Sequence, residues 1–198
     1  MMIFALDLAT KSGFAYGLPG AVPRSGSVIL KKPNEGRAVA FANLIAFLAA
    51  EWTIARPALV VKEAALALEA FKTLGMSEAN VRLQYGLHSI VEGMAVRFKV
   101  PIGLNPATGN DPTDSVVRKH FIGTGRVGTR DETKAAVVTR CQLLGLMPRD
   151  SHDDNRGDAI ATWDWACAHL ARRPATAFAF FGQQQPRTGE ASHDEIEA

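Results

Sequence analysis

Three acidic side chains stand where carboxylates can do chemistry. Asp7 comes at the end of the apolar run IFALD, and Glu63 ends a second run, ALVVKE. Asp158 closes the acidic stretch DSHDDNRGD. Carboxylates that crowd together raise one another's pKa, so such groups share protons or bind cations. Hard oxygen ligands of this kind suit Mg²⁺ or Mn²⁺.

The residues just before Asp158 leave the membership of this cluster open. Asp154 lies four residues before Asp158 and Asn155 lies three before it, and either spacing puts both side chains on one helix face. Asp153 lies five before it and falls off that face. Asp153 and Asp154 can also cap a helix, where the helix dipole favours negative charge. Each acid has a simpler alternative, and Glu63 could form a surface pair with the lysine beside it.

The elements that position these acids follow from hydrophobic patterning. Apolar or alternating runs predict strands at 2–8, 12–18, 24–30, 58–64 and 100–106. Helical spacing predicts helices at 35–55, 79–98, about 113–121, 131–145 and 155–172. The short first links imply antiparallel hairpins, whereas the later strand–helix–strand units imply parallel pairing with right-handed crossovers. The sequence predicts an α/β fold with a mixed five-stranded sheet and helices on both faces.

This arrangement brings the acids together. If the strands at 2–8 and 58–64 are adjacent and parallel, their carboxyl ends place Asp7 beside Glu63. A helix that begins near residue 155 and packs on that edge would bring Asp158 to them.

The length and charge of the chain set its domain organisation. The 198 residues suit one domain, which we expect at 1–173, followed by a tail at 174–198 that is partly disordered. The last ten residues hold four acids and no Lys or Arg, so the rest of the chain carries about +6 against +2 overall. That charge is compatible with a polyanionic partner and equally with an ordinary solvated surface.

Cysteines and apolar segments indicate the compartment. Cys141 and Cys167 lie among apolar residues of expected helices, which predicts buried thiols in a reducing environment. The N-terminus lacks the charged region and cleavage site of a signal peptide. The most apolar stretch, AVAFANLIAFLAAEW, is interrupted by Asn43 and is too short to cross a bilayer. We therefore expect a cytoplasmic protein without a membrane span.

Five segments, in order, resemble the RuvC-type Holliday junction resolvases of the RNase H-like superfamily. FALDLATKSGFAYG is similar to the first hairpin of that family, and LVVKEA to the strand with its second carboxylate. GMSEANVRLQYGLHSIVEGMAVRFKVPIGLNPAT resembles its loop, long helix and next strand. VVRKHFIGTGRVGTRDETKAAVVTRCQLLGL resembles its basic, glycine-containing segment, and DDNRGDAIATWDWACAHL its closing helix. The resemblance covers roughly residues 2–172, and the short, divergent chain is similar to the phage-type branch.

The resemblance implies an RNase H-like fold and a crossover-junction endodeoxyribonuclease that acts on branched DNA as a homodimer, in DNA recombination and repair. Asp7, Glu63 and Asp158 would be the catalytic metal ligands, with Asp153, Asp154 or Asn155 completing the site. Two Mg²⁺ or Mn²⁺ ions about 4 Å apart would clamp the scissile phosphate. One departure stands out, because the family often has an acid or His at the position of Asn155.

Basic side chains and one aromatic residue are candidate DNA contacts. Lys134 resembles the family's lysine on the helix after the glycine-containing loop, although it also fits an exposed helix lysine. The candidate phosphate contacts around that loop are Arg118, Lys119, Arg126 and Arg130. Phe71 is a candidate wedge at an opened junction, with a core residue as its alternative.

Two other function classes stay open. A junction-binding protein of the same fold that does not cleave is compatible with Asn155. Actin-like and sugar-kinase-type ATPases also begin with a strand, an Asp and a Gly/Thr turn, but they need a second such hairpin domain, and the sequence does not offer one.

Overall fold

The computed structural model describes residues 1–66, 75 and 77–171. Phe71 and the expected tail at 174–198 lie outside the described residues. One sheet has the strand order β3-β2-β1-β4. Its strands are β1 (Ile3–Asp7), β2 (Lys11–Gly17), β3 (Arg24–Ile29) and β4 (Leu59–Lys62). β2 pairs antiparallel with both β1 and β3, whereas β1 and β4 are parallel, as the sequence predicts.

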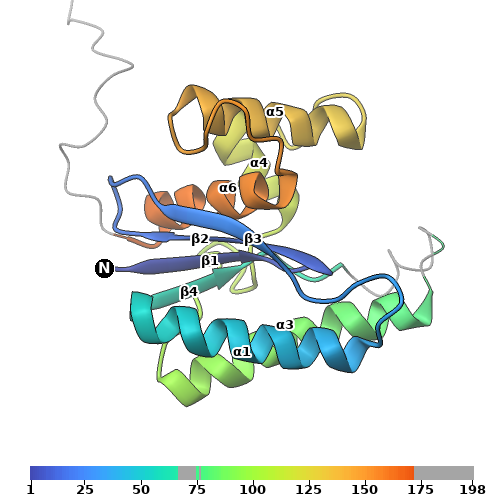
Figure 1. Cartoon of the computed structure of the whole chain (residues 1–198). Coiled ribbons are helices and arrows are strands. Elements are labelled where there is room, and N and C mark those ends of the chain that lie inside the picture. The colour runs from blue at the N-terminus through green and yellow to red at the C-terminus, as the bar shows by residue number, and fades with distance from the viewer. Residues whose placement is uncertain (67–74, 76, 172–198) are drawn as a thin grey trace, which may run out of the picture.

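Helices cover both faces of the sheet, which confirms the predicted layering. α1 (Arg37–Ala55) and α3 (Glu78–Phe98) lie on one face. α6 (Asp154–His169) lies on the other, with α4 (Asp114–Ile122) and α5 (Arg130–Leu143) packed outside it (Figure 1).

The predicted fifth strand is wrong. The segment makes a single parallel bridge, between Val60 and Ile102. The Val60 amide donates to the Pro101 carbonyl at 3.0 Å, and the Gly103 amide donates to the Val60 carbonyl at 2.7 Å. Pro101 has no amide hydrogen to donate, so it cannot add a bond of its own to a ladder with β4. The sheet of the described residues therefore has four strands.

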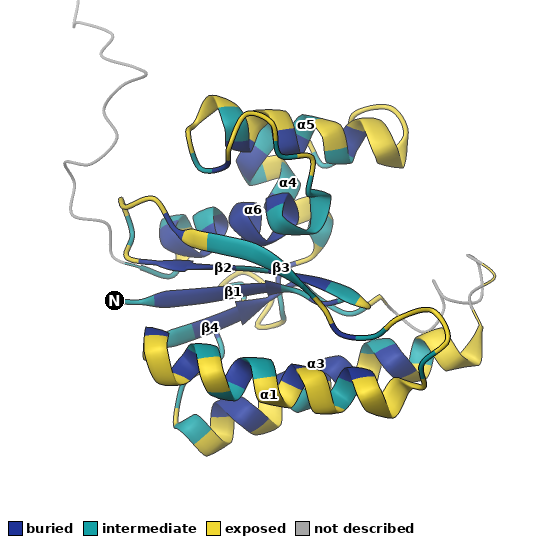
Figure 2. Ribbon diagram, viewed as in Figure 1, coloured by how far each residue is buried: buried dark blue, intermediate teal, exposed yellow. Residues whose placement is uncertain are grey.

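The alternation of side chains along β1 decides which layer Asp7 faces. Ile3 and Ala5 belong to the buried core under α6, whereas Phe4 and Leu6 belong to the core under α1 and α3. Successive side chains of a strand point to opposite faces, so Asp7 falls in the same series as Ile3 and Ala5. Figure 2 shows β1 buried between the two helical layers.

The same alternation separates Lys62 from Glu63. Val61 packs in the core under α6, and Val60 packs in the opposite core. Glu63 therefore follows Val61 toward α6, while Lys62 faces the layer of α1 and α3.

α1 has the length and apolar composition of a membrane-spanning helix, alone among the helices of the described part of the chain. The argument that this stretch is too short is therefore wrong. Its buried residues recur every three to four positions and pack in the core beneath the sheet: Ala40, Leu44, Leu48, Trp52 and Ala55. Only this stripe of α1 is buried, and 28% of its apolar window is buried in all.

Neither cysteine forms a disulfide, and both are buried, as predicted. Cys141 lies on α5 against α6, and burial raises the pKa of its thiol to about 12. A thiol with so high a pKa is inert as a nucleophile or metal ligand at neutral pH.

Candidate active site

Asp7 ends β1 opposite Gly13 of β2. A Cβ atom at position 13 would lie 1.9 Å from the backbone carbonyl oxygen of Asn155. Only glycine allows this approach, which seats the first turn of α6 directly on β2. The start of α6 is thereby held beside the end of the strand that carries Asp7.

Glu63 continues the line of β4 next to Asp7. The parallel register pairs Leu6 with Lys62, and the Glu63 amide donates to the Leu6 carbonyl at 3.2 Å. The Glu63 carboxylate is 8% exposed and accepts a hydrogen bond from Thr162 of α6 at 2.8 Å. Glu63 is thus no partner of Lys62 on the surface, and it faces α6 instead.

Asp158 is buried on α6 and is joined by two residues of α4. Arg118 lies 3.4 Å from the Asp158 carboxylate and 3.5 Å from that of Asp114. Asp114 was not foreseen from the sequence, because an acid just after Thr113 indicates a helix cap. Thr113 does cap α4, and Asp114 then reaches the cluster. Arg118, expected as a surface contact for DNA, is instead turned inward.

The charges of the acids influence one another's pKa values. Burial and the charges of Asp158 and Asp114 together raise the pKa of Asp7 to about 8. Burial also raises the pKa of Glu63 well above its usual range, helped by Asp114 and Asp7. Burial raises the pKa of Asp158 although Arg118 opposes it. Negative charge is therefore in excess at this edge of the sheet.

The chemistry of the carboxylate side chains bears on whether this site could bind a metal ion. Within the described residues, no three His, Cys, Asp or Glu side chains form a group that could hold a metal ion. The donors are nevertheless carboxylates with raised pKa values, and hard divalent cations are the partners that such a set favours. In this structure the positive charges of Arg118 and Lys134 partly oppose the rise in the pKa of Asp7 and Asp158.

Asp153 holds the start of α6 and is not part of the acid cluster. It is the N-cap of α6 and accepts from the Arg156 amide at 3.4 Å. Its carboxylate also accepts from Lys11 at 3.0 Å and from Ser27 at 2.6 Å. The bonds with Lys11 and Ser27 connect the start of α6 to β2 and β3. Asp153 therefore has the helix-capping role that the sequence left open.

Asp154 is paired with Lys134 of α5 across the start of α6. Burial alone would raise the pKa of Asp154, but the hydrogen bond and charge of Lys134 outweigh it and hold the pKa below its usual value. Lys134 is therefore a half-buried, paired lysine rather than an exposed one. Asn155 meets Gly13 through its backbone.

The remaining candidate DNA contacts surround the loop between α4 and α5. Lys119, Arg126 and Arg130 are all exposed. The Arg126 guanidinium donates to the Gly128 carbonyl at 2.8 Å, which braces the loop. Thr129 then begins α5 with a capping box.

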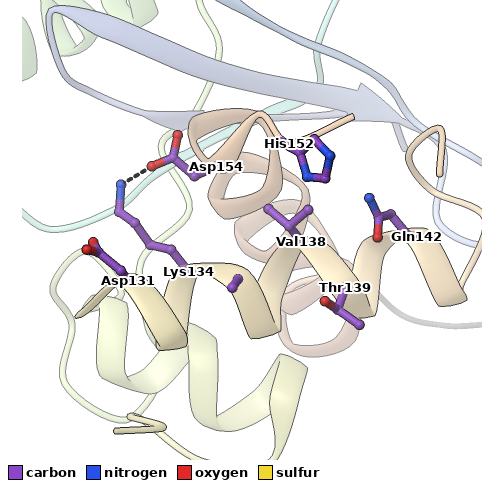
Figure 3. A pocket seen from close by; sticks show the side chains of 8 residues that line it. Asp131, Lys134, Val138, Thr139, Gln142, His152 and Asp154 are labelled. Carbon is purple, nitrogen blue, oxygen red and sulfur yellow. Dashed lines mark hydrogen bonds and ion pairs between the residues drawn. The ribbon is translucent and has the colours of Figure 1, made fainter. Parts of the chain in front are cut away.

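A pocket of about 360 Å³ opens between α5 and the start of α6 (Figure 3). Its lining residues are Asp131, Lys134, Ala135, Val138, Thr139, Gln142, His152 and Asp154. Lys134 and Asp154 belong both to this pocket and to the surroundings of the acid cluster. The other lining residues carry no motif that the sequence could have revealed.

Comparison with known proteins supports the fold. No family model matches the sequence, and no curated protein matches it. The structure is similar to that of RuvC from Thermus thermophilus, with a TM-score of 0.57 and 17% identity over 85% of this chain and 96% of that one. It is also similar to T. thermophilus RuvC in complex with a Holliday junction substrate, with a TM-score of 0.58 and 14% identity over 82% and 90% of the two chains. The chain thus has a RuvC-like α/β fold.

Proposed function

We propose that this protein is a divalent-metal-dependent endonuclease that cleaves branched DNA such as Holliday junctions. The observation that carries the proposal is that Asp7 and Glu63 end neighbouring parallel strands, with pKa values raised by burial and by carboxylates that include Asp158. Perturbed carboxylates from separate elements are typical of a functional site. The RuvC-like fold, and the junction bound by one similar structure, favour branched DNA as the substrate.

In this proposal Asp7, Glu63 and Asp158 hold Mg²⁺ or Mn²⁺, two ions per site, and Asp154 or Asn155 completes the set. The bound ions would supply an activated water and stabilise the leaving 3′ oxygen. Thr162 orients Glu63 through its 2.8 Å hydrogen bond.

Basic side chains of the protein would bind the phosphate backbone of the DNA. Lys119, Arg126 and Arg130 are exposed around one loop, and in this proposal they contact phosphates. We further propose that the protein acts as a cytoplasmic homodimer in DNA recombination and repair, and that it belongs to the phage-type branch.

A cleavage panel tests the proposal. Four-way, three-way, flap and linear DNA are incubated with Mg²⁺, Mn²⁺ or EDTA. We expect Asp7→Asn to bind the four-way junction within about threefold of the wild-type affinity while losing cleavage by about 10³-fold, since metal-assisted hydrolysis needs the ligand charge. Asp150→Asn, at an exposed acid after α5, serves as the matched control. Cleavage by Asp7→Asn at the wild-type rate would contradict the assignment.

A non-cleaving junction-binding protein is the second candidate. It is favoured by the pairing of Asp158 with Arg118, which gives this acid a counter-charge from the chain itself. Tight junction binding without cleavage in either metal would support this candidate over the nuclease.

A further inference from the structure

Arg118 of α4 places its guanidinium between two acids of the cluster. One terminal nitrogen lies 3.5 Å from the carboxylate of Asp114, four residues earlier on the same helix. The other lies 3.4 Å from the carboxylate of Asp158 on α6. The Arg118 side chain is 14% exposed and that of Asp158 is 6% exposed, so this second pair meets inside the protein.

The contacts of Arg118 are electrostatic rather than well-formed hydrogen bonds. Charge-assisted N–H···O bonds are about 2.7–2.9 Å long, so both contacts are stretched. Within the part of the chain that the structure describes, the Arg118 Nε atom is buried without a hydrogen-bond partner. By contrast, Asp153 accepts bonds of 3.0 and 2.6 Å from Lys11 and Ser27. Arg118 therefore loses little directed bonding if it leaves the acids.

The negative charge of several acids keeps Arg118 in place. Burial lowers the pKa of Arg118, but the neighbouring carboxylates outweigh burial and raise it above its ordinary value. Among these carboxylates Asp158 contributes most, followed by Asp114 and Glu63. In return, the positive charge of Arg118 opposes the rise in the pKa of Asp7 and Asp158. Arg118 thus compensates part of the same negative charge that a divalent cation would compensate.

We propose that Arg118 is a built-in competitor of the divalent cation: its guanidinium pairs with Asp114 and Asp158 in this structure and gives way when the ion binds. This inference rests on the proposed nuclease function and adds how its site is regulated. Arginine and the ion compete because both need the carboxylate of Asp158. The affinity of the site for Mg²⁺ or Mn²⁺ is thereby kept below the affinity that the acids alone would give.

Metal binding in the absence of DNA tests this competition. Free Mn²⁺ is measured by electron paramagnetic resonance as it is titrated into the protein, so the readout does not depend on cleavage. Arg118→Gln should bind Mn²⁺ at least about tenfold more tightly than the wild type, because removing a positive charge beside two carboxylates strengthens their attraction for the ion. Arg82→Gln is the matched control and should bind Mn²⁺ as the wild type does. Arg82 also pairs with an acid four residues earlier in its helix, Glu78, but it is exposed on α3.

A variant that keeps the positive charge guards against misfolding. Arg118→Lys retains the charge, but an ammonium group lacks the planar fork that spans two carboxylates. This variant should bind Mn²⁺ with an affinity between those of the wild type and Arg118→Gln. Thermal unfolding with and without Mn²⁺ checks the fold, and the ion should raise the Tm of Arg118→Gln more than that of the wild type.

Nitrogen NMR follows the arginine itself. The Arg118 Nε–H signal is assigned by its loss in Arg118→Lys, and Mg²⁺ is then added to the wild-type protein. We expect this signal to shift in step with Mg²⁺ binding, because the guanidinium leaves the acids. An unchanged signal at saturating Mg²⁺ would show that the ion binds without displacing Arg118.

The outcomes separate this inference from the nuclease proposal. Equal or weaker Mn²⁺ binding by Arg118→Gln overturns the competition, whether or not the wild type cleaves DNA. If the variants bind Mn²⁺ as expected but no junction is cleaved, the nuclease proposal fails while the competition stands. If neither the wild type nor Arg118→Gln binds Mn²⁺, the competition is overturned, and the cleavage panel alone decides on the nuclease.

Discussion

The fold disfavours ionisation of the site carboxylates. Burial, with the charges of Asp158 and Asp114, raises the pKa of Asp7 from its ordinary value of 3.8 to about 8. When the folded-state pKa is raised, the unfolded chain loses its proton first as the pH rises. Stability is therefore lost between about pH 4 and pH 8, and the loss is complete above the folded-state value.

The first prediction concerns Asp7→Asn without metal. In EDTA the variant should match the wild type near pH 4 and exceed it increasingly up to pH 8, because the amide never ionises. Each pKa unit corresponds to about 1.4 kcal/mol. Since the Asp7 side chain is partly exposed, we expect the free energy of unfolding to rise by about 1–3 kcal/mol at pH 8. Urea unfolding at pH 4, 6 and 8 measures this change.

Asp150→Asn serves as the control for that series. Asp150 is exposed and away from the cluster, so its substitution should leave the pH profile unchanged. A destabilised Asp7→Asn protein at pH 8 would show that Asp7 is ionised and favourably paired in the metal-free fold.

Part of the site could be predicted because two of its acids lie where buried strands end. Asp7 and Glu63 could be placed side by side because both follow buried strands that pair in parallel. Asp114 could not be placed beside them from the sequence, since its position depends on the irregular path of the chain before α4. Thr162 is four residues after Asp158 on the same helix, so helical spacing alone could have suggested it.

At the level of elements, the contact between β2 and α6 builds the site. Gly13 faces Asp7 in the strand register and touches the first turn of α6. The hydrogen bonds that Asp153 accepts from Lys11 and Ser27 stabilise the same contact between α6 and the sheet. Any side chain at position 13 must push α6 away from β2.

The second prediction follows from that contact. Gly13→Ala should lower the free energy of unfolding by more than about 2 kcal/mol, since overpacking against backbone cannot be relieved by a side-chain rotation. Gly93→Ala is the matched control. Gly93 lies in α3 with nothing near its absent Cβ, so alanine there should stabilise by up to about 1 kcal/mol. Equal stability of the two variants would contradict the close packing of α6 on β2.

The third prediction concerns the buried lysine of β4. Lys62 is 2% exposed and pairs with Asp111 and with Glu92, the latter at 3.2 Å. The Ala64 amide also donates to the Pro112 carbonyl at 2.8 Å, so β4 holds the segment that leads into α4. Lys62→Met should lower the free energy of unfolding by about 3 kcal/mol, because it leaves Asp111 half-buried without its cation.

A double variant separates the charge from the packing. Lys62→Met combined with Asp111→Leu should recover part of that loss in urea unfolding, since no uncompensated charge stays behind. If the double variant loses the sum of the two single losses, the ion pair is not the cause.

Helices and strands could be predicted where the sequence signals that define them, such as hydrophobic spacing and capping residues, are local. α3 was expected at 79–98 and runs Glu78–Phe98, capped by Ser77. The fifth strand failed because its apolar run looks extended in isolation, while a strand also needs donors along its length. Such pairing is a tertiary property, and Pro101 prevents it.

On the scale of the whole molecule, the two sides of the sheet have different roles. The core under α1 and α3 is built from apolar side chains of β1, β2 and β4. The opposite side carries the acid cluster, the pocket and the exposed basic loop, all within the layers formed by α4, α5 and α6 (Figure 1). The exposed basic loop therefore lies on the same side of the sheet as the acids.

That placement leads to a prediction about salt. If Lys119, Arg126 and Arg130 contact phosphates, junction binding should weaken linearly in log K against log salt concentration, with a slope of about −0.9 per neutralised phosphate. Arg130→Ala should make the slope shallower by about 1 and weaken binding equally for all sequences. Arg37→Ala, at an exposed arginine of α1 on the opposite layer, should leave the slope unchanged. Fluorescence anisotropy from 50 to 300 mM salt in EDTA separates binding from cleavage, and a flat response would rule out the loop as the DNA-binding surface.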